Sequence, residues 1–456
     1  MIVKNKFTGE VFMEIKDTTR SEAHAILRNG VKATGNMAEL PRFKIYDSLM
    51  DISDKLKKNS SDLARIISIE AGKPIKLSRK EAMRAANTFQ FAAEETRRAH
   101  GETVPLDVEP RGIHRTAFFN RVPVGLIYSV TPFNDPLNLV AHKIAPAIAA
   151  GNAIINKPAS LAPVSALRLS EMASETDLPD HAVQEVISVG GGEISNLFLT
   201  SDAIKMITFT GGTEAAEKLV RKAGVKKYSM ELGNNSPVIV WNDADLDSAA
   251  ESVVDAAFES QGQNCIHAQR ILVKSDVYEY FRNRLIEITS RLKIGDPLDE
   301  NTDIGPMITE SEAIRVENSV KEACALGSNL LAGGNRDGSF MAPTILENVP
   351  PESPVWKKEI FGPVMMIMPV ESMDEAINLA NDVEYGLQAG VFSSDINLAM
   401  QAIERLNFGT VLINDSSDFR IDTMPFGGMK KSGIGREGVR FSMEEMSEIK
   451  LAIIKR

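Results

Sequence analysis

Cysteine is scarce in this chain. Only two occur among its 456 residues, Cys265 and Cys324. They cannot build a disulfide framework, and this usage is typical of a protein kept in a reducing compartment. None of the six histidines has the spacing of a zinc protease site, and the two cysteines are far apart, so we predict no metal site. The expected location is the cytoplasm.

Long apolar runs and an excess of positive charge are also missing. The most apolar stretch, 144–155, is too short to span a bilayer and contains Pro146, Gly151 and Asn152. The first residues lack the apolar core of a signal peptide. The net charge of −11 argues against a broad surface for nucleic acid. We therefore expect a globular protein with neither a membrane segment nor a nucleic-acid partner.

The usual phosphate-binding motifs give no support for a nucleotide site. There is no Walker A sequence. The stretch from Gly433 to Gly438 matches the pattern of the dinucleotide fingerprint, but that fingerprint needs a preceding strand and a following βαβ unit of about 30 residues. Only 18 residues follow Gly438. A dinucleotide, if bound, is held without this motif.

The sequence does contain a regular alternation of strand and helix patterns. A first set lies between 124 and 232 and includes a predicted strand at 183–189. A second set begins after Gly233 and ends with a strand at 409–414. Such alternation predicts parallel strands joined by crossover helices, with ligands at the carboxyl ends of the strands. The predicted fold class is α/β, with two doubly wound domains that meet in a cleft near 231–235.

Two segments fit neither domain. Residues 114–122 are polar and aromatic with β character, and 449–454 form a short apolar strand near the end of the chain. An apolar terminal strand needs a partner, which is either a neighbouring subunit or a strand of its own chain. The sequence leaves both pairings open.

Short polar motifs follow several of the predicted strands. In chain order they are Thr131-Pro132-Phe133-Asn134, Lys157-Pro158-Ala159-Ser160, Phe209-Thr210-Gly211-Gly212, Met230-Glu231-Leu232-Gly233, Gln261-Gly262-Gln263-Asn264-Cys265, Lys358-Glu359-Ile360-Phe361-Gly362-Pro363 and Pro425-Phe426-Gly427-Gly428. A lone cysteine is most often a buried thiol, and we interpret Cys324 in this way. Taken together and in this order, the motifs resemble the aldehyde dehydrogenase superfamily over nearly the whole chain.

The resemblance implies catalysis by a cysteine. Cys265 matches the nucleophile, whose thiolate attacks the aldehyde carbon and gives a tetrahedral thiohemiacetal. The side-chain amide of Asn134 and the backbone N–H of Cys265 match the donors that stabilise its oxyanion. Glu231 matches the general base that activates water to hydrolyse the thioester. The implied reaction is the NAD(P)-dependent oxidation of an aldehyde to its carboxylic acid.

The resemblance also implies a nicotinamide cofactor bound to the first domain. Lys157 matches the lysine that hydrogen-bonds the adenosine ribose. Gly211 and Gly212 match the turn that opens a helix near the pyrophosphate. Glu359 and Phe361 match the residues that hold the nicotinamide ribose and ring. The other positions expected to contact the cofactor are Thr131, Pro132, Phe133, Ala159, Ser160, Gly190 and Leu232.

Three positions depart from the common family pattern. Many NAD-preferring members have a glutamate where this chain has Ser160, and a glutamate repels a 2′-phosphate. Serine removes that repulsion, so we expect NAD or NADP, with a slight preference for NADP. Asn234 replaces a glycine after Glu231-Leu232-Gly233, and asparagine tolerates unusual backbone angles. Gly212 stands where many members have serine.

The positions that match the family's aldehyde tunnel are polar in this chain. Asp135 and His142 stand where many members carry large aromatic residues. Arg420 lies in a segment, 414–420, that is similar to the lactaldehyde dehydrogenase branch, and a guanidinium suits a carboxylate, sulfonate or phosphonate. A surface salt bridge is the alternative for Arg420. Asp135 would repel an anion unless it is paired with His142 or an arginine. The other expected pocket residues are Asn264, Ile266 and Phe419.

The resemblance divides the chain into three parts. These are a cofactor-binding domain (1–109 and 127–232, with about 429–441), a catalytic domain (233–428) and a small β oligomerisation element (110–126 and 442–456). We expect a homodimer or a homotetramer, with the oligomerisation element pairing with a neighbouring subunit.

Three functions compete. The first is oxidation of a small polar or anionic aldehyde, such as a lactaldehyde-like, sulfo- or phosphono-aldehyde, or a semialdehyde. The second is an acylating dehydrogenase that passes the thioester to coenzyme A, and Glu231 argues against it because thiol transfer needs no such base. The third is a scaffold without activity, which need not keep Asn134, Glu231 and Cys265 together.

Overall fold

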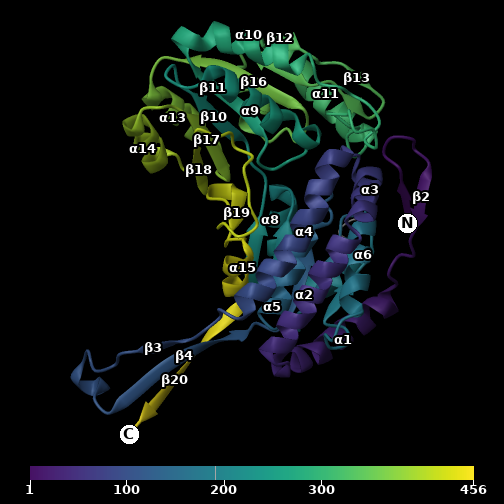
Figure 1. The fold of residues 1–456 in the computed structure, drawn as a ribbon, viewed down its shortest axis with the longest axis vertical. Coiled ribbons are helices and arrows are strands. Elements are labelled where there is room, and N and C mark those ends of the chain that lie inside the picture. The colour runs from purple at the N-terminus through teal and green to yellow at the C-terminus, as the bar shows by residue number, and fades with distance from the viewer. Residues whose placement is uncertain (190–191) are drawn as a thin grey trace.

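The computed structural model describes residues 1–189 and 192–456 and arranges them around three larger sheets. Figure 1 shows two α/β bodies, one above the other, and a narrow arm that projects below them and ends at the C-terminus. Among the described residues, no helix combines the length and the apolar character needed to cross a bilayer.

The lower body is built on a six-stranded sheet of order β19-β9-β8-β5-β6-β7, in which every pair is parallel except β19 with β9. Its strands are β5 (Leu126–Val130), β6 (Ala153–Lys157), β7 (Val183–Glu185), β8 (Ile204–Thr210), β9 (Lys227–Glu231) and β19 (Gly433–Ile434). Fully buried residues such as Ile127, Ile154 and Ile207 fill these strands, as a parallel sheet covered on both faces requires.

Helices cover this sheet on both faces. They are α1 (Arg20–Glu39), α2 (Arg42–Lys58), α3 (Ser60–Ala71), α4 (Ile75–Thr96), α5 (Asn138–Ala149), α6 (Val164–Ser174), α7 (Glu193–Thr200) and α8 (Thr213–Ala223). Every residue of α5 is buried, and the helix packs against α4 and α2 within one apolar core. Because α5 is fixed on all sides, the loop before it, which carries Asn134 and Asp135, starts from a rigid base.

The upper body has a seven-stranded sheet of order β12-β15-β16-β11-β10-β17-β18, parallel except for the edge strand β12. Its strands are β10 (Ser236–Val240), β11 (Ala268–Lys274), β12 (Asn329–Ala332), β15 (Thr344–Glu347), β16 (Val364–Val370), β17 (Gln388–Phe392) and β18 (Thr410–Ile413). Its helices are α9 (Leu246–Phe258), α10 (Tyr278–Thr289), α11 (Glu310–Ala325), α12 (Pro354–Lys357), α13 (Met373–Asn381) and α14 (Ile396–Arg405). Cys324 packs against one apolar cluster of this body, as expected for a structural thiol.

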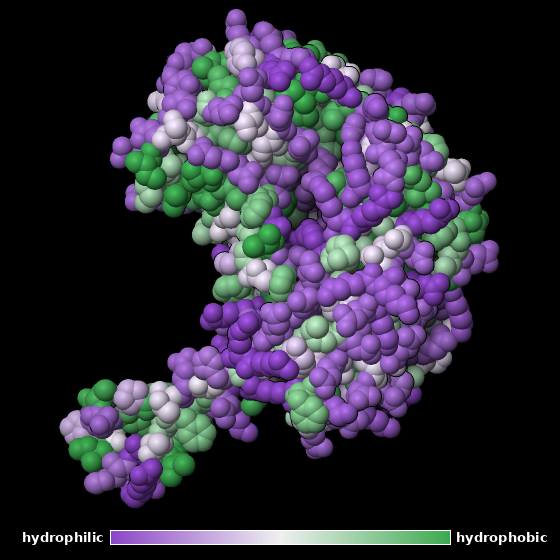
Figure 2. Space-filling view, viewed as in Figure 1, coloured by the Kyte–Doolittle hydropathy of each residue, from purple (hydrophilic) through white to green (hydrophobic). Residues whose placement is uncertain are grey.

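The arm is a three-stranded antiparallel sheet of order β20-β4-β3. It contains β3 (Glu102–Val104), β4 (Arg115–Pro123) and β20 (Ser447–Lys455), and α15 (Val439–Glu445) precedes β20. β20 pairs with β4 along its whole length, so the apolar terminal strand finds its partner in its own chain. Ile449, Leu451 and Ile453 nevertheless remain about half exposed, and Figure 2 shows apolar residues over the arm.

Short elements complete the chain. Two hairpins are formed by β1 (Ile2–Lys4) with β2 (Val11–Glu14) and by β13 (Arg336–Asp337) with β14 (Phe340–Met341). Four 3₁₀ turns are η1 (Pro110–Gly112), η2 (Glu259–Gly262), η3 (Ser275–Val277) and η4 (Lys430–Ser432).

The strand predicted at 183–189 is shorter than expected. β7 ends at Glu185, because the chain then turns toward the N-terminal segment. There the backbone N–H of Thr18 donates to the carbonyl of Ile187, and the N–H of Ile187 donates to Thr18 Oγ1. The edge of the sheet is thus closed by a loop instead of by further strand.

Candidate active site

The linker between β9 and β10 joins the two bodies, and Asn234 is buried within it. Its backbone N–H donates to Glu359 Oε1 (3.0 Å), its side-chain amide donates to Ser236 Oγ (2.7 Å), and its Oδ1 accepts from the Leu387 N–H (3.2 Å). Asn234 is not among the residues with positive φ. This position therefore uses the hydrogen-bonding side chain of asparagine and not its tolerance of unusual backbone angles.

Cys265 lies in a tight turn between η2 and the amino end of β11. The three residues Ser260, Gln261 and Gly262 are all left-handed, with φ of 51°, 60° and 64°. Two consecutive non-glycine residues in this region are costly, and such strain persists only where the surroundings hold it. Here Gln261 Nε2 donates to the Gly72 carbonyl at 2.5 Å. This tight turn places Cys265 just before the start of β11.

A cavity of about 120 Å³ opens at the half-buried Cys265. Of the residues predicted for the site, it is lined by Asn134, Asp135, Asn264, Cys265, Ile266 and Arg420. His142 and Phe419 do not line it: His142 is buried behind it, and the Phe419 side chain is exposed at the surface. Segments from both bodies therefore converge on one small space.

Both groups expected to bind an oxyanion are available in this cavity. Within residues 1–189 and 192–456, neither the Asn134 side-chain amide nor the Cys265 backbone N–H has a hydrogen-bond partner. The Cys265 thiol itself lies 3.8 Å from Asn264 Oδ1. Burial raises the pKa of this thiol, Arg420 opposes the shift, and Glu359 and Glu231 add to it. The net shift favours the neutral thiol, and Arg420 is the nearby cation that acts in the direction of the thiolate.

Glu231 is the last residue of β9, next to the linker between the two bodies, and it does not line the cavity at Cys265. It is 3% exposed, and in the described part of the chain neither carboxylate oxygen has a hydrogen-bond partner. Burial, followed by the charge of Glu437, raises the pKa of Glu231 well above its usual value. Buried carboxyl groups without partners are rare, and a raised pKa suits a group that must take up a proton near neutrality.

Behind the cavity, the Asp422 carboxylate accepts hydrogen bonds from three side chains. His142 donates from Nε2 to its Oδ1 at 2.8 Å, Arg84 donates from Nη2 at 2.8 Å, and the Asn138 amide donates at 3.3 Å. Burial and then Arg420 lower the pKa of His142, so it is neutral at neutral pH. His142 thus anchors the loop that carries Asp422 to α5.

Arg420 continues this network and faces the cavity. Its Nη2 donates to Glu437 Oε2 at 2.9 Å, and its guanidinium stacks on the Phe426 ring at 3.7 Å. The side chain is 8% exposed, and its Nε has no partner among the described residues. The surface salt bridge that was the alternative for Arg420 does not describe this buried pair. Burial would raise the pKa of Glu437, but Lys143 and Arg420 lower it to about 2.

Asp135 is neutralised, although by a different partner from those expected. Its carboxylate contacts the buried ammonium of Lys73, which also contacts Glu81 at 2.6 Å. Burial alone would lower the pKa of Lys73, yet Asp135 and Glu81 raise it. Glu81 in turn accepts the Leu137 N–H at 2.9 Å and so holds the loop that carries Asn134 and Asp135.

The reasoning from sequence missed the supporting charges of the site. These are Lys73, Glu81, Arg84, Lys143, Asp422 and Glu437. The sequence contains one signal of these charges. Lys143 is a charged residue within the strongly apolar helix α5, and a buried ammonium requires a buried partner. The identity of that partner, nearly 300 residues away, is set by the fold.

Most of the residues predicted for the cofactor lie at the ends of β5, β6, β8 and β9 or on the loops that follow them, while Glu359 and Phe361 lie between α12 and β16. Thr131 follows β5, and its N–H bonds the carbonyl of Lys157 at the end of β6 (3.1 Å). Ala159 and Ser160 follow Lys157 in the same loop, and Gly211 and Gly212 lead into α8, for which Gly212 is the N-cap. Leu232 follows β9, and its N–H donates to the Ser432 carbonyl. Gly190 lies outside the described residues.

The nicotinamide end of the predicted site is assembled from both bodies. Phe133 and Phe361 meet edge to face, with ring centroids 5.9 Å apart. Phe361 has a φ of 46°. Burial raises the pKa of Glu359 to about 7, although the hydrogen bond from the Asn234 N–H lowers it. Pro132 lies beside Phe133 in the loop after β5.

These residues fit a dinucleotide. The hydroxyls of Thr131 and Thr210 are buried without partners in the described part of the chain. The Lys157 ammonium has no ion pair there, and burial lowers its pKa. A Cβ atom at Gly212 would have no neighbour within 4 Å, so there is room for a ligand group at the start of α8. Unsatisfied donors along one edge of the sheet indicate a polar ligand.

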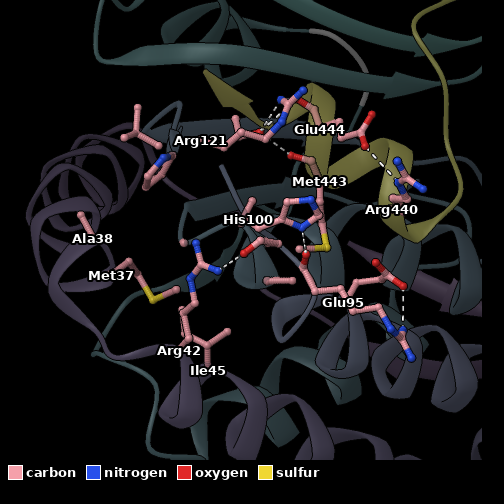
Figure 3. A pocket seen from close by; sticks show the side chains of 18 of the residues that line it. Met37, Ala38, Arg42, Ile45, Glu95, His100, Arg121, Arg440, Met443 and Glu444 are labelled. Atoms are coloured by element: carbon pink, nitrogen blue, oxygen red, sulfur yellow. Dashed lines mark hydrogen bonds and ion pairs between the residues drawn. The ribbon is translucent and has the colours of Figure 1, made fainter. Parts of the chain in front are cut away.

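A larger cavity, of about 600 Å³, lies at the base of the arm and contains none of the predicted site residues. Figure 3 shows arginines of this cavity bound to glutamates or to backbone. Arg440 pairs with Glu444 at 3.1 Å, Arg121 donates to the Glu444 carbonyl at 3.0 Å, and Arg42 donates to the Ala99 carbonyl. Its arginines are thus engaged, and no cysteine lines it, so we assign the chemistry to the smaller cavity.

Comparison with known proteins agrees with this geometry. The profile described as "Aldehyde dehydrogenase family" matches residues 1–452. An aspartate-semialdehyde dehydrogenase of Pseudomonas canavaninivorans is 44% identical over 99% of this chain and 96% of its own length. A 3-sulfolactaldehyde dehydrogenase of Priestia aryabhattai is 43% identical over 100% of this chain and 94% of its own length.

A solved structure shares the fold as well. Glyceraldehyde-3-phosphate dehydrogenase GapN from Methanocaldococcus jannaschii, complexed with NADP, superposes with a TM-score of 0.96 at 40% identity and covers 100% of this chain and 99% of its own. The resemblance to the lactaldehyde dehydrogenase branch is confirmed, since further relatives at 40% and 41% identity are lactaldehyde dehydrogenases. The predicted α/β fold is likewise confirmed. The chain belongs to the aldehyde dehydrogenase family and is an NAD(P)-dependent oxidoreductase that acts on the aldehyde group.

Proposed function

We propose that Cys265 carries the reaction through a covalent intermediate. Its thiolate attacks the aldehyde carbon, and the oxyanion that forms accepts hydrogen bonds from the Asn134 amide and the Cys265 N–H. Nicotinamide, when bound, supplies the hydride acceptor that this oxidation needs. The observation that carries the proposal is that both donors and the thiol line one cavity while neither donor is bonded elsewhere in the described chain.

Glu231 completes the reaction as the general base for thioester hydrolysis. Water gives its proton to the carboxylate, its oxygen attacks the thioester carbon, and the carboxylic acid leaves as the Cys265 thiol re-forms. The raised pKa of Glu231 supports uptake of this proton, and within the described residues no hydrogen-bond partner holds its carboxylate in place. A base at this position favours hydrolysis over transfer to coenzyme A.

We infer that the substrate is a small aldehyde with an acidic group. Arg420 and Arg84 both line the cavity, and the Nε of Arg420 is buried without a partner in the described chain. The pairing of Asp135 with Lys73 removes the repulsion that an anion would otherwise meet. The named substrates of the three relatives above carry a carboxylate, a sulfonate and a phosphate, which supports the same class.

For the cofactor we propose a slight preference for NADP. Ser160 leaves no carboxylate to repel a 2′-phosphate. The NADP complex of GapN, at 40% identity, supports this choice. Comparing kcat/KM for NADP and NAD with one aldehyde measures the preference, and a Ser160→Glu variant should shift it toward NAD.

For the assembly we propose a homodimer or homotetramer built through the arm. β20 is an edge strand with unpaired backbone groups, and its half-exposed Ile449, Leu451 and Ile453 favour cover by a second copy.

We propose the same three domains, with the boundaries predicted from sequence. The pairing of β19 with the first sheet supports assigning 429–441 to the cofactor domain. Two free thiols support the cytoplasm as the location.

The test follows nicotinamide reduction by absorbance with NAD or NADP. The panel holds lactaldehyde, glyceraldehyde, 4-oxobutanoate, sulfo- and phosphono-aldehydes and hexanal, each with and without coenzyme A. We expect the anionic aldehydes to be oxidised fastest and the product to be the free acid. A thioester of coenzyme A as the product would establish the acylating alternative, and no turnover of any aldehyde would overturn the proposal.

A further inference from the structure

One short turn of the lower body lies against the upper body. It is formed by Gly72 and Lys73, between the end of α3 and the start of α4. Gly72 has a φ of 74°, which glycine adopts easily, and a Cβ atom there would lie 2.6 Å from the carbonyl oxygen of Pro306. Just beyond the turn, the backbone N–H of Ile75 donates to the Pro297 carbonyl at 2.7 Å. The turn is therefore packed closely on the upper body, against the segment between α10 and α11.

The carbonyl of Gly72 holds the turn that carries Cys265. It accepts a hydrogen bond at 2.5 Å from Nε2 of Gln261, a residue that is 1% exposed. Gln261 is one of the left-handed residues before Cys265, and backbone strain of this kind persists only where surrounding contacts hold it. Gly305 leaves room for the bond, because a Cβ atom there would collide with both bonded atoms. A carbonyl of the lower body thus fixes the upper-body turn that presents the Cys265 N–H.

The ammonium of Lys73 holds the loop that carries Asn134. The Lys73 side chain is 4% exposed, and its Nζ contacts the carboxylate of Asp135, the residue after Asn134. The same Nζ donates to Glu81 Oε2 at 2.6 Å, and the other oxygen of Glu81 accepts the N–H of Leu137 at 2.9 Å. Without the ammonium, two neighbouring buried carboxylates would repel each other. Lys73 therefore keeps in place the residues that directly follow Asn134.

We propose that the Gly72-Lys73 turn is a positioning element that fixes the two oxyanion donors relative to each other. The Asn134 amide comes from the lower body and the Cys265 N–H from the upper body, so their separation depends on how the bodies are joined. Both donors must reach one oxygen at about 2.7–3.1 Å, and an error of about 1 Å costs about 10²-fold in rate. The turn bonds the loop of each donor and acts through these loops. The inference rests on the proposed oxidation at Cys265 and adds the element that aligns its groups.

The experiment measures kcat and KM separately for the full-length enzyme with NADP. The substrates are lactaldehyde, which is neutral, and 4-oxobutanoate, which has a carboxylate. Lys73→Met removes the ammonium and Gln261→Met removes the amide donor, and each keeps a side chain of similar length. Asp135→Asn is a milder variant, which breaks the ion pair with Lys73 but leaves the pair of Lys73 with Glu81. Thermal unfolding checks that each variant is folded, and Asp135→Asn replaces Lys73→Met if the latter is not.

Lys76→Met is the matched control. Lys76 lies three residues beyond Lys73 and pairs with Asp303 across the same two bodies, but it does not line the cavity. Each variant is also combined with Asn134→Ala. In that background the donor that Lys73 aligns is already absent, so a positioning role loses its effect, whereas a general loss of structure does not.

Lys73→Met should lower kcat by about 10- to 100-fold on both aldehydes, with KM changed by less than about threefold. Asp135→Asn should lower kcat in the same way but by less. Gln261→Met should lower kcat by about tenfold, and Lys76→Met should stay within about twofold of the wild type. In the Asn134→Ala background, Lys73→Met should lower kcat by less than about threefold.

Two results would overturn the inference while the oxidation stands. The first is an equal loss of kcat for Lys73→Met with and without the Asn134 amide, which would show a general effect on the fold. The second is a loss confined to the KM for 4-oxobutanoate, which would show that Lys73 binds the acidic group of the substrate. If the wild type oxidises no aldehyde, or if Asn134→Ala keeps full kcat, the proposed function itself is wrong.

Discussion

The two cavities of this protein differ in how their polar groups are satisfied, and the smaller cavity is the one that contains unpaired groups. The larger one, at the base of the arm, has about 600 Å³, and its arginines are bound to glutamates or to backbone carbonyls. The smaller one has about 120 Å³ and contains a thiol, a free amide and an arginine Nε without partners in the described chain. Unsatisfied polar groups are costly unless a ligand uses them, so they mark a site better than volume does.

The largest expected effect is at the nucleophile. Replacing Cys265 by Ala should lower kcat by about 10⁴-fold or more, because no other group forms the covalent intermediate. Cys324→Ala is the matched control, since that thiol packs against the core away from the cavity. Steady-state kinetics on one aldehyde measure both. An equal loss in the two variants, or none in either, contradicts the role of Cys265.

A second effect tests the free amide of the smaller cavity. Asn134→Ala should lower kcat by about 10²–10³-fold, because one oxyanion donor is removed while the substrate still binds. KM should change much less than kcat. A loss confined to KM would show that Asn134 binds the ground state instead of the transition state.

A third effect is a pH dependence at the cofactor end of the smaller cavity's site. The pKa of Glu359 is raised to about 7. If Glu359 holds the nicotinamide ribose as proposed, its charged carboxylate accepts a hydrogen bond from a ribose hydroxyl more strongly than the protonated carboxyl does. The KM for the nicotinamide nucleotide should therefore rise about tenfold as pH falls from 8 to 6, because protonation weakens the acceptor. Glu359→Gln should flatten this profile. A profile with the same slope in the variant would assign the titration to another group.

The smallest effect is expected at the base of the arm. Arg440→Gln breaks an exposed ion pair with Glu444, so the free energy of unfolding should change by less than about 1 kcal/mol. Activity should stay within about twofold of the wild type. Denaturant unfolding and kinetics check both values, and a loss comparable to that at Asn134 would mean that the arm's cavity takes part in the reaction.

Much of the site could be predicted from the sequence because its residues sit in short motifs. Asn134 follows a strand, Glu231 ends one and Cys265 precedes one, and local pattern is enough to place such residues at the edge of a sheet. The fold class followed from the same alternation. Residues 183–189 were harder, since the chain leaves the sheet for a contact with Thr18 that no local pattern encodes.

Long-range pairing accounts for what the sequence did not indicate. His142 was expected in the pocket, but its Nε2 bonds Asp422, 280 residues further along the chain, and this holds the ring behind the cavity. Asp135 was predicted to repel an anion unless it paired with His142 or an arginine, and it pairs with Lys73 instead. Such choices depend on which charged side chains the fold brings together, and spacing along one chain does not specify them.

The central claim is that Cys265 forms a thioester which Glu231 then removes. The direct test is intact-protein and peptide mass spectrometry of Glu231→Gln after mixing with an oxidisable aldehyde and NADP. We predict an acyl adduct on the peptide that contains Cys265, formed within the first turnover and lost slowly, and no adduct in the Cys265→Ala, Glu231→Gln double variant. Continued turnover without an adduct on Cys265, or an adduct on Cys324, would contradict the account.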